Sequence, residues 1–422
     1  MTRPSLLRSR RGLLIGAGAA GAVALAASRR PPDRGGGHSD YFLNVSRALT
    51  EAGFARPTLV VDRSLLLTNA DAAAATLSQS GLALRLVVKS LPAFGLLDPL
   101  AERLRTNRYM VFNGAMLQRM AEARPEADLL LGKPLPVREA AEFMARTPLS
   151  SAPQWLIDTP QRLTEYIEAA RARSAPLRVN FEIDVGLHRG GFPDAAALAA
   201  ALDIAGAEPL VEICGLMGYD PHVPRMPNAA DAFLQSQASY REAIECLTSK
   251  VDAAPAALTL NSAGSPTYKL HAAGTVANEV SVGSAFVKPV DFDLDTLAHH
   301  QPAAFIATPV IKALDGARIP GLEALEGAFA LWDPNSARAF FIYGGHWLAR
   351  PESPPGLQYS SMFGRSSNQE MLTGSRRVRL DVDDWVFLRP LQSEAVFLQF
   401  GPIAIYEEGR IVDVAETFPV SA

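Results

Sequence analysis

The chain has 422 residues, of which 48% are apolar and 20% are charged. These values are ordinary for a globular protein and exclude a disordered chain, a collagen-like chain and a polytopic membrane protein. The 40 basic and 44 acidic residues give a formal net charge of -4, so the composition has no bulk electrostatic signature of nucleic-acid binding.

Residues 1–30 are expected to be an export signal or an N-terminal membrane anchor. Four arginines precede an uncharged run over residues 12–27, which is shorter than the roughly 18 residues of a membrane-spanning helix. The Ala24-Leu25-Ala26 triplet has the small-residue pattern of a cleavage site. The segment around Arg10 and Arg11 resembles a twin-arginine signal, which implies a periplasmic protein or one anchored facing the periplasm. Residues 31–40 are expected to be a linker.

From Arg56 onward, short apolar runs alternate with stretches of helical spacing. The helical stretches include residues 64–80, 136–146, 160–173 and 229–249. The expected strands are residues 58–62, 84–88, 109–112, 128–131, 154–157, 178–183, 211–217, 258–260 and 280–282. Strands that alternate with helices pair in parallel through crossover connections, and about eight such units fit a (β/α)₈ barrel of the TIM type. A doubly wound open sheet is the alternative, although no G-x-G-x-x-G follows the first strand.

After about residue 300 the pattern changes to short apolar runs separated by Pro, Gly, Asn and Asp. Strands are expected over residues 303–311, 337–343, 378–380, 385–388, 396–400 and 404–408. We therefore predict an α/β fold with a barrel in residues 41–300, followed by a C-terminal all-β domain in residues 301–422.

Lys89, in the segment LRLVVKSLP, lies at the carboxyl end of the second expected strand. Catalytic residues of such barrels cluster at this end of the strands. A lysine directly after an apolar run is expected to be partly desolvated, which lowers the pKa of its amine and favours the neutral form that a Schiff base requires. The alternative is a solvated lysine on the barrel rim, where unreactive charges are common.

Three later segments place polar side chains after expected strands. In NFEIDVGLHRGGF (residues 180–192), Arg189 could bind an anionic oxygen of a ligand. In GLMGYDPHV (residues 215–223), Tyr219 and His222 suit contacts with a flat heterocycle. In NSAGSPTYKLH (residues 261–271), Gly, Ser and Thr lie between a strand and a helix, a pattern that suits a phosphate. Each segment alone also fits ordinary packing or a turn.

In this order, the four segments resemble those of the fold-type III pyridoxal-phosphate enzymes, whose barrel is the alanine racemase N-terminal domain. The greater similarity is to the branch of D-threonine aldolases and D-serine dehydratases. RPTLVVDRSLLLTNA resembles the first strand and helix of that branch, and ANEVSVGSAFV (residues 277–287) resembles its crossover into the β domain. The similarity extends from about Arg56 to Val414.

The resemblance implies pyridoxal 5'-phosphate as cofactor and a role for each matching residue. Lys89 would be the Schiff-base lysine, Arg189 would lie on the phenolate side of the cofactor, and His222 would lie near the face of its ring. The remaining cofactor-binding residues implied are Tyr219 beside the ring and Gly264, Ser265 and Thr267 at the phosphate.

The activity implied is that of a lyase, an aldolase or a dehydratase, acting on a D-amino acid. An amino acid racemase and a non-catalytic pyridoxal-phosphate-binding protein are the alternatives, and a barrel that binds a ligand without cofactor is a weaker one. The resemblance also implies a homodimer in which the β domain of one subunit completes the site of its partner.

The sequence departs from this branch at the divalent metal site. The branch usually holds the metal through a histidine and a cysteine or aspartate in a P-x-H-x-C/D pattern, but here Gln392 and Glu394 occupy these positions. The loss of imidazole weakens the case for zinc, so no metal ligand is assigned. His346 is a candidate site residue or a surface loop histidine. Cys214 and Cys246 are expected to be unpaired buried thiols, because one lies in an expected strand and the other in an expected helix.

Overall fold

A computed structural model describes residues 30–146, 152–316, 332–360 and 363–420. Of the expected export signal or anchor in residues 1–30, residues 1–29 lie outside the described residues. The described chain divides into two compact units, each built from two stretches of sequence. One unit contains residues 30–57 and Ala307–Leu388, and the other contains Thr58–Ile306 and Arg389–Ala422. Within the described ranges, no helix is both long enough and apolar enough to cross a membrane.

The larger unit contains an eight-stranded parallel barrel, as the alternation of strands and helices predicts. Its strands are β2 (Ala83–Val87), β3 (Arg108–Val111), β4 (Asp128–Leu131), β5 (Trp155–Ile157), β6 (Leu177–Ile183), β7 (Val211–Gly218), β8 (Thr259–Ser262) and β9 (Glu279–Val282). Neighbouring strands follow the order β4-β3-β2-β9-β8-β7-β6-β5. A parallel bridge between Leu130 and Gln154 joins β4 to β5 and completes the ring. The predicted barrel is confirmed.

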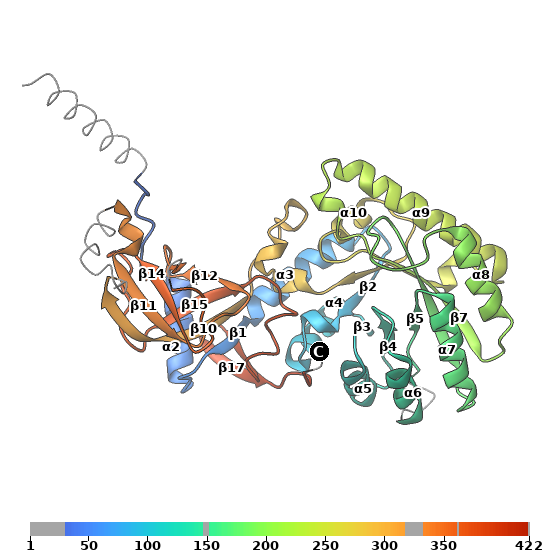
Figure 1. The fold of residues 1–422 in the computed structure, drawn as a ribbon, viewed down its shortest axis with the longest axis horizontal. Coiled ribbons are helices and arrows are strands. Elements are labelled where there is room, and N and C mark those ends of the chain that lie inside the picture. Colours follow the sequence, from blue (N-terminus) through green and yellow to red (C-terminus); the bar gives the residue numbers. More distant parts are fainter. Residues whose placement is uncertain (1–29, 147–151, 317–331, 361–362, 421–422) are drawn as a thin grey trace, which may run out of the picture. The chain divides into compact units, whose positions relative to one another are not determined.

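Helices cover the outside of this barrel. They are α3 (Arg63–Leu77), α4 (Phe94–Leu104), α5 (Gly114–Ala123), α6 (Val137–Arg146), α7 (Pro160–Arg171), α8 (Ala195–Gly206), α9 (Ala229–Lys250) and the short α10 (Tyr268–Ala273). Figure 1 shows α5 to α8 side by side outside the strands. Side chains cap several helix starts. The Thr159 hydroxyl, for example, accepts a hydrogen bond from the main-chain N–H of Arg162, with Pro160 as the first helical residue.

The first expected strand, β1 (Thr58–Asp62), lies outside the barrel. It pairs in parallel with β16 (Ile403–Glu407), which pairs antiparallel with β17 (Arg410–Ala415). All five residues of β1 are buried, so its apolar run does not distinguish it from a barrel strand. Only the pairing partner, about 340 residues later in the chain, places it in a different sheet.

The smaller unit is mainly β-structure. Its elements are α2 (Asp40–Glu51), β11 (Arg338–Tyr343), β12 (Ala349–Ser353), β13 (Gln358–Tyr359), β14 (Gln369–Gly374) and most of β10 (Ala304–Asp315) and β15 (Trp385–Pro390). The sheet order is β13-β14-β11-β10, and β15 pairs with β10 and β12. The ring of Phe42 in α2 lies 4.8 Å from that of Phe387 in β15, so α2 packs on this sheet.

Several expectations for the C-terminal third are wrong. Residues 378–380 and 396–400 are not strands, although Val396 and Phe397 are fully buried, because an apolar turn can fill a core as well as a strand does. The elements α2, β12, β13, β14 and β17 were not expected. The two units also do not begin or end at residues 40 and 300: α2 lies in the β unit, and β16 and β17 lie in the barrel unit.

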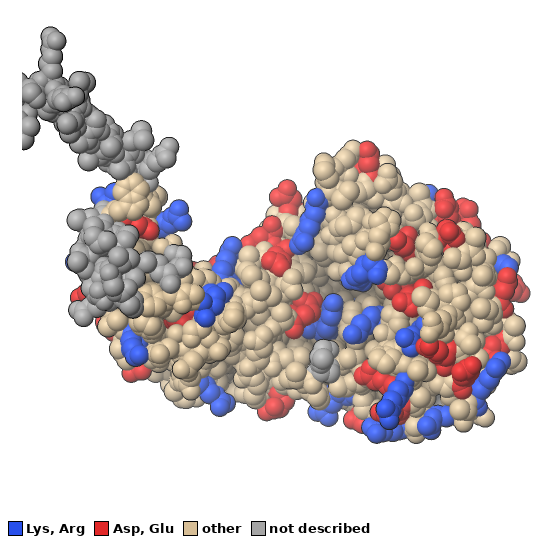
Figure 2. Space-filling view, viewed as in Figure 1, with Lys and Arg blue, Asp and Glu red and all other residues tan. Residues whose placement is uncertain are grey.

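Charged side chains of both signs are distributed over the surface of the barrel unit. On the face drawn in Figure 2, Lys and Arg alternate with Asp and Glu and form no extended patch of a single sign. This distribution agrees with the small net charge of -4.

Candidate functional site

A cavity lies at the carboxyl ends of the barrel strands. This position is that of a small-molecule site in a parallel barrel. Five of the seven residues expected at the cofactor lie on its wall: Lys89, Arg189, Tyr219, Gly264 and Ser265. The other polar side chains on the wall are Ser90, Asn261, Ser281, Ser284 and Glu394.

Lys89 follows β2 in a 3₁₀ turn formed by Val88–Ser90, with buried residues on both sides. Its Nζ lies 4.3 Å from the centre of the Phe112 ring. Burial lowers the pKa of the Lys89 amine, the charge of Glu394 acts in the opposite direction, and Arg189 and Lys133 lower it further. The neutral, nucleophilic form of the amine is therefore more populated in this site than it would be for a lysine in water.

Arg189 is held on a closed loop after β6. The main-chain N–H of Asp184 donates to the carbonyl of Phe192 at 3.0 Å, and the N–H of Phe192 donates to the carbonyl of Glu182 at 2.8 Å. Gly191 has a φ of 92°, and a Cβ there would lie 2.7 Å from the carbonyl carbon of Ile183, so the loop closes only with glycine at this position.

The guanidinium of Arg189 contacts two side chains near the cavity. Its central carbon lies 4.8 Å from the centre of the Tyr219 ring, and Nη2 lies 3.9 Å from Oε1 of Glu182. Burial raises the pKa of the Tyr219 phenol, which therefore stays neutral at ordinary pH. The cation thus lies over an aromatic face and beside a carboxyl group, and both contacts limit its movement.

Glu182, at the end of β6, is a carboxyl group that titrates near neutral pH. Burial raises its pKa to about 7, against the influence of Arg189, while Asp158 and Asp184 raise it further. The unfolded chain releases this proton near pH 4.5, and the folded protein retains it to about pH 7. Its contribution to folding is therefore fully present below pH 4.5 and is lost as the pH rises to 7.

The variant Glu182→Gln should remove this loss, because the amide does not ionise. We expect the free energy of unfolding of the variant, relative to the wild type, to increase by about 3 kcal/mol between pH 4.5 and pH 8. Urea unfolding midpoints at both pH values measure the change. Glu168→Gln, at an exposed position on α7, is the matched control and should show little pH-dependent difference. Equal pH dependence of the two variants would contradict the assignment.

The turn after β8 presents the hydroxyl of Ser265 to the cavity. Its oxygen accepts hydrogen bonds from the main-chain N–H groups of Gly283 (3.1 Å) and Ala285 (3.0 Å). A serine hydroxyl has two acceptor sites and one donor, so the O–H of Ser265 remains available to an anion in the cavity. The neighbouring Gly264 lies against Tyr219, because a Cβ there would be 2.6 Å from the ring.

Two of the residues expected at the cofactor, His222 and Thr267, do not line this cavity. The Thr267 hydroxyl donates to Asp220 Oδ1 at 2.6 Å and accepts from the main-chain N–H of Gly264 at 3.2 Å. His222 Nε2 lies against Gly186, and its buried Nδ1 has no hydrogen-bond partner among the described residues. Thr267 is thus part of the internal bonding of the turn that carries Ser265.

A buried Asp–His pair supports this turn and was not expected from the sequence. Both residues are 0% exposed, and Asp220 Oδ2 lies 2.8 Å from Nε2 of His271. Through Thr267, the same carboxylate is bonded to the turn after β8. Asp220 lies inside the segment GLMGYDPHV, but no pattern in the sequence indicates that its partner is 51 residues later.

The two positions that resemble metal ligands have different hydrogen-bond partners in the described chain. The Gln392 amide nitrogen donates to Asp291 Oδ2 at 2.9 Å. Glu394 instead accepts hydrogen bonds from serine hydroxyls and lies on the cavity wall. No three His, Cys, Asp or Glu side chains of the described residues are grouped as metal ligands.

His346 lies in the β unit, where its main-chain N–H donates to Glu370. Cys214 is buried, Cys246 is half-buried, and both are free thiols.

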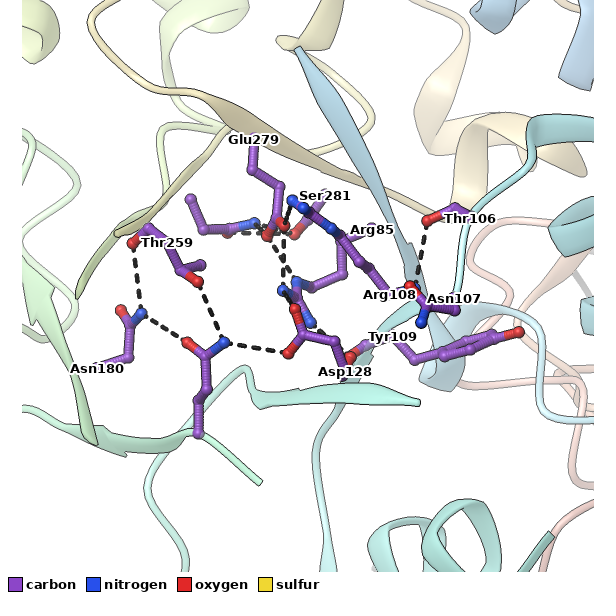
Figure 3. Close-up of polar contacts among 12 residues, drawn as sticks. Arg85, Thr106, Asn107, Arg108, Tyr109, Asp128, Asn180, Thr259, Glu279 and Ser281 are labelled. Atoms are coloured by element: carbon purple, nitrogen blue, oxygen red, sulfur yellow. Dashed lines mark hydrogen bonds and ion pairs between the residues drawn. The ribbon is translucent and has the colours of Figure 1, made fainter. Parts of the chain in front are cut away.

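Polar side chains from several barrel strands form a hydrogen-bonded network (Figure 3). Arg85 Nε donates to Glu279 Oε1 at 2.6 Å, and Arg85 Nη2 donates to Asp128 Oδ2 at 2.9 Å. Glu279 Oε1 also accepts from the amide of Asn261 at 2.7 Å, and Asn261 lines the cavity. Burial alone would lower the pKa of Arg85, but Glu279 and Asp128 outweigh it and raise that pKa. The network thus fixes the orientation of the Asn261 amide.

The sequence matches one protein family, described as alanine racemase, N-terminal domain. The match covers residues 61–289, which is more than half of the chain and includes the barrel and the cavity lysine. The chain belongs to this family. The resemblance seen in the sequence to the fold-type III enzymes is thereby confirmed. A search of curated proteins gave no significant match.

Several solved structures have a similar fold over most of this chain. D-threonine aldolase from Filomicrobium marinum is 16% identical, with 85% of this chain and 94% of that chain covered and a TM-score of 0.70. D-threo-3-hydroxyaspartate dehydratase from Delftia sp. HT23 is 15% identical, covers 87% and 98%, and has a TM-score of 0.66. Alanine racemase from Bacillus anthracis is 15% identical, covers 86% and 98%, and has a TM-score of 0.65. At these identities the similarity shows the fold alone.

Proposed function

We propose that this protein is a pyridoxal-phosphate-dependent lyase of the aldolase or dehydratase type that acts on a D-amino acid. The observation that carries the proposal is the half-buried side chain of Lys89 on the wall of the barrel cavity, where desolvation lowers the pKa of its amine. The family is one of pyridoxal-phosphate enzymes, and two of its structural neighbours are a D-threonine aldolase and a dehydratase of a D-amino acid. An alanine racemase is a neighbour of similar rank, so the choice of a lyase rests on the sequence resemblance to the aldolase and dehydratase branch.

The residues on the wall fit this cofactor. Lys89 would bind its aldehyde carbon, because the neutral amine is the nucleophile for that bond. The free O–H of Ser265 would donate to the phosphate, and Arg189 would donate to an anionic oxygen of the ring. When bound, pyridoxal phosphate withdraws electrons from the α-carbon of an attached amino acid. When it is not bonded to the cofactor, the amine of Lys89 would hold or release a proton at Nζ.

Absorbance and chemical trapping test this proposal. Purified protein supplied with pyridoxal phosphate should show a visible absorbance band. Borohydride reduction followed by mass spectrometry should then locate a pyridoxyl group on Lys89. Incubation with D-threonine, D-serine and D-alanine, with assays for aldehyde, keto acid and L-isomer, distinguishes aldolase, dehydratase and racemase. An adduct at another lysine would overturn the assignment of Lys89. If the cofactor-loaded protein were inactive on a wide panel of amino acids, the proposal that it is an enzyme would be overturned.

The variant Ser265→Ala should weaken binding of the phosphate group in particular. A hydrogen bond to a charged group contributes about 1.5–3 kcal/mol, so the Kd for pyridoxal phosphate should rise roughly 10- to 100-fold. Removing the hydroxyl also removes the acceptor of two main-chain N–H groups. This second loss should weaken the binding of pyridoxal and of pyridoxal phosphate equally. The measurement is therefore the ratio of Kd values for pyridoxal and pyridoxal phosphate. A ratio unchanged from that of the wild type would place the phosphate elsewhere.

The location and the assembly are also part of the proposal. The twin-arginine-like segment supports export to the periplasm, or anchoring to the membrane facing it. Family resemblance supports a homodimer. Cell fractionation tests the location, and a fully active monomer in light scattering would contradict the dimer.

A further inference from the structure

Among the described residues that line the barrel cavity, Glu394 is the single acidic side chain, and Lys89 and Arg189 are the basic ones. Its Oε1 accepts hydrogen bonds from the hydroxyls of Ser90 at 2.7 Å and Ser284 at 3.2 Å. Its Oε2 accepts one, from Ser393, at 3.3 Å. The carboxylate is thus held in place at the wall by neutral hydroxyl groups.

The bonding of Glu394 leaves one of its oxygens largely free. A carboxylate has about four acceptor sites, and Oε2 has a single long hydrogen bond. Glu394 also forms no ion pair within 4.0 Å with any described residue, so its charge is not neutralised by a direct cation contact. A ligand in the cavity would therefore meet an accepting oxygen that carries a negative charge.

From this geometry we infer that Glu394 determines specificity for the substrate side chain. Its carboxylate accepts a hydrogen bond from a neutral, donor-bearing side chain and excludes a side chain with a negative charge. The inference rests on the proposed function and deepens it, because it names the substrate class: amino acids with an uncharged hydroxyl- or amide-bearing side chain. This role of Glu394 needs no metal. The neighbouring Gln392 is hydrogen-bonded to Asp291.

Asparagine and aspartate form a matched pair for the test, because their side chains have almost the same shape and differ in charge. We expect wild-type protein loaded with pyridoxal phosphate to bind D-asparagine about 10- to 100-fold more tightly than D-aspartate, as like charges a few ångström apart repel at low effective dielectric. Calorimetric titration measures both Kd values without depending on turnover. In Glu394→Gln the preference should disappear, and in Glu394→Asp, which keeps the charge, it should remain.

Further measurements separate the possible outcomes. Glu407→Gln removes one negative charge from the surface ion pair with Arg63 and should keep the wild-type preference. Equal Kd values for the two ligands in wild-type protein that shows the Lys89 band would overturn the inference and leave the proposed function standing. Absence of the band would overturn the proposed function itself. A preference for D-aspartate that EDTA abolishes would show a bound cation at Glu394 and overturn the inference.

Discussion

Replacing Lys89 by alanine should abolish the visible absorbance band of the cofactor-loaded protein and reduce its kcat about 10⁴-fold or more. The size follows from the loss of a covalent catalytic group, whose removal is not compensated by the rest of a site. The Lys89 side chain lines a cavity, so removing it should leave the fold intact. The measurements are an absorbance spectrum, borohydride trapping and the kcat on the most active amino acid of the panel.

Lys133→Ala is the control for this prediction. Lys133 is exposed, lies close enough to influence the Lys89 amine by its charge, and is absent from the cavity wall. Its variant should keep the band and most of the activity. If Lys89→Ala retained both the band and the activity, the cofactor would be bound elsewhere. Addition of methylamine to Lys89→Ala should restore part of the rate, because a free amine can replace the proton-accepting group.

Replacing Glu279 by alanine should lower the free energy of unfolding by about 3–5 kcal/mol, because it leaves a buried arginine without its main partner. Arg85 and Glu279 are both 0% exposed and are joined by two hydrogen bonds, Nε to Oε1 at 2.6 Å and Nη2 to Oε2 at 3.0 Å. The Asn261 amide loses an acceptor in the same variant. Denaturant unfolding midpoints measure the change.

An exposed ion pair is the matched control for this prediction. Arg103 and Asp71 are joined at 2.6 Å, but their side chains are 55% and 50% exposed, so Asp71→Ala should cost less than about 1 kcal/mol. A loss in Glu279→Ala no larger than in this control would contradict a structural role for the buried network. Because Glu279 holds the amide of Asn261 on the cavity wall, the variant should also bind cofactor more weakly.

Local features of the site were predictable because the residues belong to the ends of strands. Lys89, Arg189 and Ser265 each lie in the segment that follows a barrel strand, and parallel strands bring their carboxyl ends to one side of a barrel. Partners joined across long stretches of chain were not predictable. The Asp220–His271 pair and the Arg85–Glu279 pair are separated by 51 and 194 residues, and no period or motif indicates either contact.

The sequence by itself determined the alternation of strands and helices, the barrel that this alternation implies, and the candidate cofactor lysine. These features follow from local periodicity and from residue types at particular positions, and they can be recognised without knowing the tertiary contacts. Tertiary structure alone decided that β1 pairs with β16 outside the barrel. It also decided that His222 and Thr267 do not line the cavity. Finally, it decided that Glu394 lines the cavity while Gln392 is bonded to Asp291. The physical reason is that each of these outcomes depends on a partner distant in sequence, and burial permits several such partners for the same apolar or polar segment.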